Sequence, residues 1–133
     1  MASDVPSPRL HHVAFGARDV ELVAGFYSEL FDLPEVARHT DAAGSLRSIW
    51  LTLGGTLLMI ERVTAAPPPR RETAGPFLLA IAVTATERLR LEGVLAERGY
   101  GVESRTAYTS YGRDPEGNRF AFSTWPDPST AAA

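Results

Sequence analysis

Few side chains in this sequence could carry chemistry, and the histidines come first among them. The 133 residues include three histidines and no cysteine. Without cysteine, disulfides, Cys-based zinc sites and thiol catalysis are all excluded. Imidazole titrates at about pH 6.5, so His12 could be a general base, a hydrogen-bonding contact to a ligand, or a satisfied polar group on a cavity wall. We expect His11 to point to the other side of the same strand and His39 to be solvated beside a polar turn.

A second set of candidate side chains lies in a predicted β-hairpin. The runs LRSIWLTL and TLLMIERV flank Gly54 and Gly55, and a Gly-Gly pair suits the primed turns that join antiparallel strands. Strand alternation then sorts both runs into two faces. One face is apolar and should cover a helix; it carries Ile49, Leu51, Leu53, Leu58 and Ile60. The other face is mixed, as a small-molecule cavity requires; it carries Ser48, Trp50, Thr52, Leu57, Met59 and Glu61.

The residues alone leave the roles of these side chains open. Trp50 is either core at an interface between modules or a stacking platform for a flat ligand. Glu61 is either a solvated charge at the end of its strand or a polar anchor in a cavity. The second half of the chain adds four polar or aromatic candidates around the turn DPEGN, with a strand register that the sequence does not fix: Tyr108, Tyr111, Arg113 and Trp125.

The elements that must position these side chains occur twice. Residues 10–33 are typical of a strand followed by an amphipathic helix, with Asp19 as N-cap. Residues 77–99 repeat that order, and Thr84 and Glu87 have the spacing of a capping box. The sequence therefore predicts two copies of one unit.

Further strands complete each predicted unit. We expect them near residues 34–39, 46–53 and 56–63 in the first unit, and near 101–106, 108–113 and 118–124 in the second. Three consecutive prolines within residues 64–76 predict a stiff, extended linker. The prediction is an α+β fold of two tandem βαβββ modules, at residues 9–63 and 77–125, with loose termini at 1–8 and 126–133.

Composition excludes several classes of function. The net charge of −3 argues against a general nucleic-acid binder, because no basic field exists to release phosphate counterions. No apolar run approaches the roughly 20 residues that span a bilayer. The first residues, MASDVPSPR, lack the basic-then-apolar pattern of an export signal. We expect a cytoplasmic protein that binds neither nucleic acid nor membrane.

Three short stretches, HVAF, FYSELF and DPEGNRFAF, together with the repeated βαβββ order, resemble the vicinal oxygen chelate superfamily. That superfamily includes glyoxalase I, extradiol dioxygenases and the bleomycin- and fosfomycin-resistance proteins. The resemblance covers about residues 9–125; Asp32 departs from it, since the family often has glycine there. It implies curved, mostly antiparallel sheets around a cup-shaped cavity, with helices on the outer face, and it suggests a homodimer.

The resemblance also implies where a metal would bind. In metal-using members the first and fourth strands of each module supply one ligand each. Matched residue by residue, these positions hold His12, Met59, Ala80 and Ala121, so only His12 could bind an ion. Glu61 lies two residues beyond Met59, about 6.6 Å along the strand, whereas metal–ligand bonds measure about 2.0–2.2 Å. We expect no metal; a divalent Zn, Ni, Fe or Mn ion is the alternative, which a register shift of two residues would restore.

Three functions fit this pattern. The favoured one is a metal-free protein of the drug-resistance type that binds a small aromatic or amphipathic molecule. The residues expected to contact it are His12, Ser48, Trp50, Met59, Glu61, Tyr108, Tyr111, Arg113 and Trp125. The alternative is a lyase, isomerase or dioxygenase, metal-dependent or using His12 or Glu61 as a general base. A third is an inert or regulatory protein with a filled cup, which the small side chains of Ala80 and Ala121 argue against.

Overall fold

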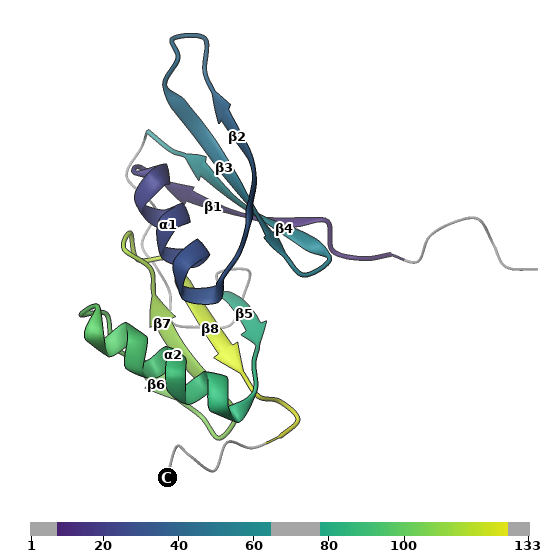
Figure 1. Cartoon of the computed structure of the whole chain (residues 1–133), viewed down its shortest axis with the longest axis vertical. Helices are drawn as coiled ribbons and strands as arrows, with labels where there is room; N and C mark the ends of the chain where they lie inside the picture. Colours follow the sequence, from purple (N-terminus) through teal and green to yellow (C-terminus); the bar gives the residue numbers. More distant parts are fainter. Residues whose placement is uncertain (1–7, 65–77, 128–133) are drawn as a thin grey trace, which may run out of the picture.

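The computed structural model describes residues 8–64 and 78–127 (Figure 1). The prolines of the predicted linker and most of the predicted loose termini lie outside the described residues. The first module comprises β1 (His12–Ala17), α1 (Val20–Phe31), β2 (Glu35–Thr40), β3 (Leu46–Leu53) and β4 (Thr56–Arg62). The second comprises β5 (Leu78–Ala82), α2 (Ala85–Glu97), β6 (Ser104–Arg105), β7 (Thr109–Arg113) and β8 (Arg119–Ser123). No described helix is both long and apolar enough to cross a lipid bilayer.

Each module forms a four-stranded mixed sheet with the same topology. The strand orders are β1-β4-β3-β2 and β5-β8-β7-β6. The first strand of each module pairs in parallel with the last, and the other neighbours are antiparallel. The predicted α+β fold of two βαβββ modules is therefore confirmed.

Short polar side chains begin both helices, as predicted. The Asp19 carboxylate accepts from Leu22 N at 3.0 Å, and the Thr84 hydroxyl accepts from Glu87 N at 3.1 Å. The second half of the expected capping box does not form, because the Glu87 carboxylate binds Arg90 instead. At the end of α1, Asp32 adopts φ 54°, a left-handed conformation that glycine takes more easily. This is the position at which the sequence departs from the family pattern.

The β3–β4 hairpin has the predicted register. Ser48 lies opposite Glu61, Trp50 opposite Met59, and Leu53 opposite Thr56. The apolar face packs against α1 as expected, and its central side chains are fully buried: Ile49, Leu51, Leu58 and Ile60. The mixed face is therefore the one that α1 leaves open.

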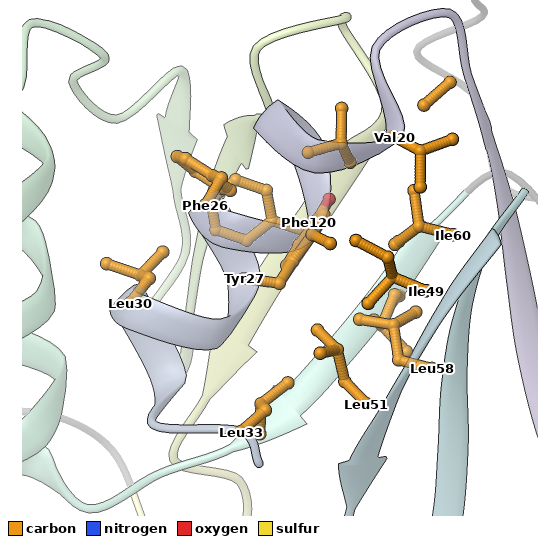
Figure 2. Close-up of a cluster of buried hydrophobic side chains, with 14 of the residues drawn as sticks. Val20, Phe26, Tyr27, Leu30, Leu33, Ile49, Leu51, Leu58, Ile60 and Phe120 are labelled. Atoms are coloured by element: carbon orange, nitrogen blue, oxygen red, sulfur yellow. The ribbon is translucent and has the colours of Figure 1, made fainter. Parts of the chain in front are cut away.

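A single core joins the two modules, with α1 in contact with both sheets (Figure 2). On one side α1 covers β3 and β4. On the other side, the Phe120 ring of β8 lies 5.5 Å from Phe26, 5.8 Å from Tyr27 and 5.9 Å from Phe31, between ring centroids. Both sheets thus turn their helix-covered faces toward one core, and their opposite faces point away from it.

The turn between β7 and β8 makes a second contact between the modules, through hydrogen bonds. The Glu116 carboxylate accepts from the backbone N–H groups of Arg18 and Asp19, both at 2.7 Å. The Asn118 amide donates to Gly16 O at 3.2 Å. These acceptors and donors satisfy backbone groups at the β1–α1 junction that would otherwise lack partners. The DPEGN turn is thus part of the contact between modules.

The second module contains a buried arginine. Arg88 of α2 is 1% exposed, and its guanidinium donates to Ser110 Oγ and to three backbone carbonyls, those of Thr106, Ala107 and Thr109. Glu92, one turn further along the helix, lies 3.7 Å from Arg88 Nε. The hydrogen bonds attach α2 to the β6–β7 connection through polar groups.

We expect Glu92 to give the protein a specific sensitivity to acid. Burial opposes ionisation of Glu92, but hydrogen bonds from Arg105 and Ser110 outweigh it and hold its pKa below the ordinary value of 4.5. A carboxyl with a lowered folded-state pKa stabilises the fold above its unfolded pKa, and this stability is lost as pH falls through the folded pKa. Glu92→Gln should therefore flatten the fall in the free energy of unfolding below about pH 4.5, measured by urea unfolding at a series of pH values. Equal acid slopes for both proteins would contradict this.

Candidate functional site

The open face of the first sheet gathers most of the predicted site residues in three rows across the strands. Cross-strand pairing and alternation put residues that share a row next to one another. The rows are His39–Ser48–Glu61–Gly16, Ala37–Trp50–Met59–Ala14 and Thr52–Leu57–His12. This face is therefore a candidate binding surface with Trp50 at its centre.

The structure does not bring His12 and Glu61 together. On β4 the partner of His12 is Leu57, whereas the partner of Glu61 is Gly16, four residues along β1 from His12. Four residues of strand span about 13 Å. The two candidate catalytic groups cannot bind one ion or act on one substrate atom.

The ring of His11 is in contact with that of its neighbour His12, and the two ring centroids are 5.2 Å apart. Its Nδ1 lies 2.9 Å from Nδ1 of His12, in a hydrogen bond between two exposed imidazoles. His12 is thus engaged with a neighbouring ring at the rim of the face.

His39 is a site residue that the sequence reasoning missed. Instead of being solvated, its ring packs on Trp50 with ring centroids 4.6 Å apart. Its partner across β2–β3 is Ser48, which is 1% exposed. The spacing of two residues from Ala37 puts His39 on the same face of β2 as the position beside Trp50, but the pairing of Ala37 with Trp50 follows a register shift that the sequence does not reveal.

The open face of the second sheet carries a tyrosine and two arginines. Tyr111 lies at its centre, and the guanidinium carbon of Arg119 stands 4.5 Å from the Tyr111 ring centroid. Arg113 donates to the Glu103 carboxylate at 2.7 Å and lowers the pKa of that carboxyl. Arg119 has no hydrogen bond or ion pair with any described residue, and it was not among the predicted site residues. Arg119 stands two residues before Ala121 on β8, so alternation places both on the same face of the strand, and this spacing was visible in the sequence.

The remaining two candidates, Tyr108 and Trp125, lie together beyond the ends of β7 and β8. Their ring centroids are 4.7 Å apart, and Trp125 is 69% exposed. They form an aromatic pair at the edge of the second module. The predicted ligand contacts therefore fall at three places: two open faces and this edge.

A groove of about 730 Å³ lies elsewhere, between the end of α1 and the start of α2. Its lining comes from the two helices, the residues that flank them, β5 and the end of β3, and includes none of the predicted site residues. Glu87 and Arg90, the charged pair at its rim, bind each other at 2.8 Å. Because these polar groups already have partners, the open sheet faces are the better candidate site.

The sequence matches the model of the Glyoxalase/Bleomycin resistance protein/Dioxygenase superfamily over residues 9–122. The chain belongs to this superfamily. Among curated proteins, none matches the sequence.

Solved structures of superfamily members share the fold at low sequence identity. Lactoylglutathione lyase from Agrobacterium tumefaciens is 20% identical, with a TM-score of 0.66 over 92% of this chain and 100% of the other. A possible glyoxalase from Bacillus cereus is 17% identical, with a TM-score of 0.71 over 88% and 99%. A mutant of the fosfomycin resistance protein FosX from Listeria monocytogenes, complexed with Mn(II) and a dihydroxypropylphosphonic acid, is 16% identical, with a TM-score of 0.74 over 89% and 93%.

The observed strand pairing shows which residues lie opposite one another at the positions where superfamily members bind a metal. Met59 lies opposite Ala14 on β1, and Ala121 lies opposite Ala80 on β5. If Met59 and Ala121 are equivalent, Ala80 corresponds to Ala14, not to His12 as the sequence alignment had it. That alignment matched the apolar letters of HVAF and AIAV, two residues away from the pairing of the strands.

In that register the counterpart of His12 is Leu78, which cannot bind a metal either. Across the described residues, no three His, Cys, Asp or Glu side chains are grouped as a metal site would need. A divalent Zn, Fe or Mn ion takes nitrogen, oxygen or thiolate ligands. In this register the four positions hold His12, Met59, Leu78 and Ala121, of which only His12 offers such a ligand, so they do not fit a superfamily metal centre.

Proposed function

We propose that this protein binds a small aromatic or amphipathic molecule without a metal, as a binding protein of the drug-resistance type. The observation that carries the proposal is the equivalence of Trp50 and Tyr111. Trp50 lies opposite Met59, and Tyr111 lies opposite Ala121, so each open face has an aromatic ring beside a position that lacks a metal donor. Such rings offer large, rigid contact area to a flat ligand.

A cup around that ligand would need two copies of the chain. Both sheets pack their helix-covered faces around α1, so the faces with Trp50 and Tyr111 point away from the shared core. A C2 homodimer would let the first sheet of one copy face the second sheet of its partner. We propose this dimer, in the cytoplasm because a chain without cysteine has no need of an oxidising compartment.

An enzyme that uses His12 and Glu61 together is the less favoured function. The two groups are four residues apart along the β1–β4 ladder. A substrate atom within hydrogen-bond reach of one group is therefore out of reach of the other. The side chains at the other three ligand positions, Met59, Leu78 and Ala121, likewise disfavour a metal-dependent lyase or dioxygenase, because none of them offers a nitrogen, oxygen or thiolate ligand.

The test uses the two tryptophans of the chain as separate reporters. In Trp125→Phe the only indole is Trp50, and bicyclic aromatic compounds should quench its fluorescence and raise the melting temperature. In Trp50→Ala the affinity of the same compounds should fall about tenfold, because the stacking ring and its apolar area are lost. Trp125→Phe is the matched control and should keep the wild-type affinity.

Two results would refute the proposal. One is a broad aromatic panel that changes neither the melting temperature nor Trp50 fluorescence. The other is stoichiometric Zn, Ni, Fe or Mn in the purified protein, measured by elemental analysis, whose removal by a chelator lowers the melting temperature. The second result would make an enzyme the better account.

A further inference from the structure

Three buried polar atoms without partners lie next to one another on the first sheet. They are Nε2 of His39, Oγ of Ser48 and Nε1 of Trp50. Ser48 is the cross-strand neighbour of His39, and the rings of His39 and Trp50 are in contact. Buried polar groups in native proteins nearly always have hydrogen-bond partners, so a cluster of three requires an explanation.

The chemistry of the three atoms defines the group that would satisfy them. An indole N–H only donates, a serine hydroxyl donates and accepts, and a neutral imidazole nitrogen can accept. A hydroxyl is the small group that accepts from Trp50 and donates to His39 or Ser48. A carboxylate only accepts, and an ammonium only donates, so either would leave part of the cluster unpaired.

Charge and access agree with a neutral hydroxyl. Glu61 is the cross-strand neighbour of Ser48 in the same row, so an anionic ligand bound at the cluster would lie close to a negative charge. His39 lies on β2, the edge strand of the sheet, and its ring is partly exposed. Rotation of this ring would open the cluster to the face.

We infer that the ligand is a hydroxylated aromatic compound, such as a phenol or naphthol, whose hydroxyl binds His39, Ser48 and Trp50. The ring of the ligand then lies over Met59 and the indole. This inference rests on the proposed binding function and adds to it the chemical class of ligand and the role of His39.

The first experiment compares three naphthalenes of matched size by isothermal titration calorimetry. We expect 2-naphthol to bind about tenfold more tightly than 2-naphthoate or 2-naphthylmethylammonium, because only the hydroxyl satisfies both donors and acceptors. Equal affinities for all three would overturn this inference and leave the proposed function standing. Binding of none of the three would count against both.

The second experiment replaces Ser48 by alanine. Deleting a buried hydroxyl without a partner should leave the melting temperature unchanged or higher, while 2-naphthol affinity falls about fivefold. Ser28→Ala, a serine of α1 whose hydroxyl donates to Leu33 O, lies on the helix side of the sheet; it is the control for affinity and should bind 2-naphthol as the wild type does. If Ser48→Ala instead lowers the melting temperature and leaves 2-naphthol affinity intact, the hydroxyl has a structural role, such as binding a bridging water, and the inference is wrong.

Discussion

Replacing Arg88 by methionine should destabilise the protein by about 3–5 kcal/mol. Methionine keeps the apolar length of the side chain but removes every donor. The carbonyls of Thr106 and Ala107 would lose their guanidinium donors, and their desolvation would no longer be offset. The Thr109 carbonyl would lose one of its two donors and keep the bond from Thr106 N. The free energy of unfolding, from urea denaturation followed by circular dichroism, measures the loss.

The matched control for Arg88→Met is Arg90→Met on the same helix. Arg90 pairs with Glu87 at the surface, where its side chain is 54% exposed, and exposed ion pairs contribute little. We expect an unchanged unfolding midpoint for this variant. Similar midpoints for both variants would show that burial of Arg88 does not carry the stability assigned to it.

Arg88 also shows what the sequence could not predict. The polar segment ATERLRLEGVLAE predicts a helix, and its N-cap at Thr84 is confirmed. Which of its two arginines is buried depends on the β6–β7 connection, which lies about 20 residues away in the sequence. Local periodicity contains no information about that contact.

The hairpin was predictable for the opposite reason. Gly54 and Gly55 fix the turn, and the turn fixes the register of every residue on β3 and β4. The faces containing Trp50 and Met59 therefore followed from a local rule. The pairing of β2 with β3 has two register shifts. For this reason the contact between His39 and Trp50 could not be predicted from the sequence.

The register between the two halves was predictable only in part. The turns at Gly55 and Gly117 make Met59 equivalent to Ala121, and the observed pairing then makes Ala14 equivalent to Ala80. Matching the first strands by their apolar letters instead makes His12 equivalent to Ala80. The two matches differ by two residues, because short apolar strands resemble one another in several registers. The position of α1 against both sheets depends on Phe120, a contact between modules that no local pattern encodes.

Replacing Asp114 by alanine should be the second strongly destabilising change, by about 3–4 kcal/mol. Asp114 is 3% exposed. Its Oδ1 accepts from Glu116 N at 2.8 Å and Asn118 N at 2.9 Å, and its Oδ2 accepts from the Tyr27 hydroxyl at 3.0 Å and the Asn118 amide at 2.8 Å. Alanine removes both carboxylate oxygens and so all four hydrogen bonds; the two from backbone N–H groups shape the turn, and the one from Tyr27 reaches α1 in the other module.

The consequence of Asp114→Ala should extend beyond the turn. Without it, Glu116 and Asn118 lose the geometry that places them on the β1–α1 junction, where Glu116 accepts from Arg18 N and Asp19 N. We expect faster exchange of the backbone amide hydrogens of Arg18 and Asp19, together with a lower free energy of unfolding. Glu29→Gln is the control, because it breaks only the exposed contact between modules, to Arg98. If Asp114→Ala lowers the free energy of unfolding but leaves hydrogen exchange at the β1–α1 junction unchanged, Asp114 stabilises the turn locally and does not stabilise the contact between the two modules.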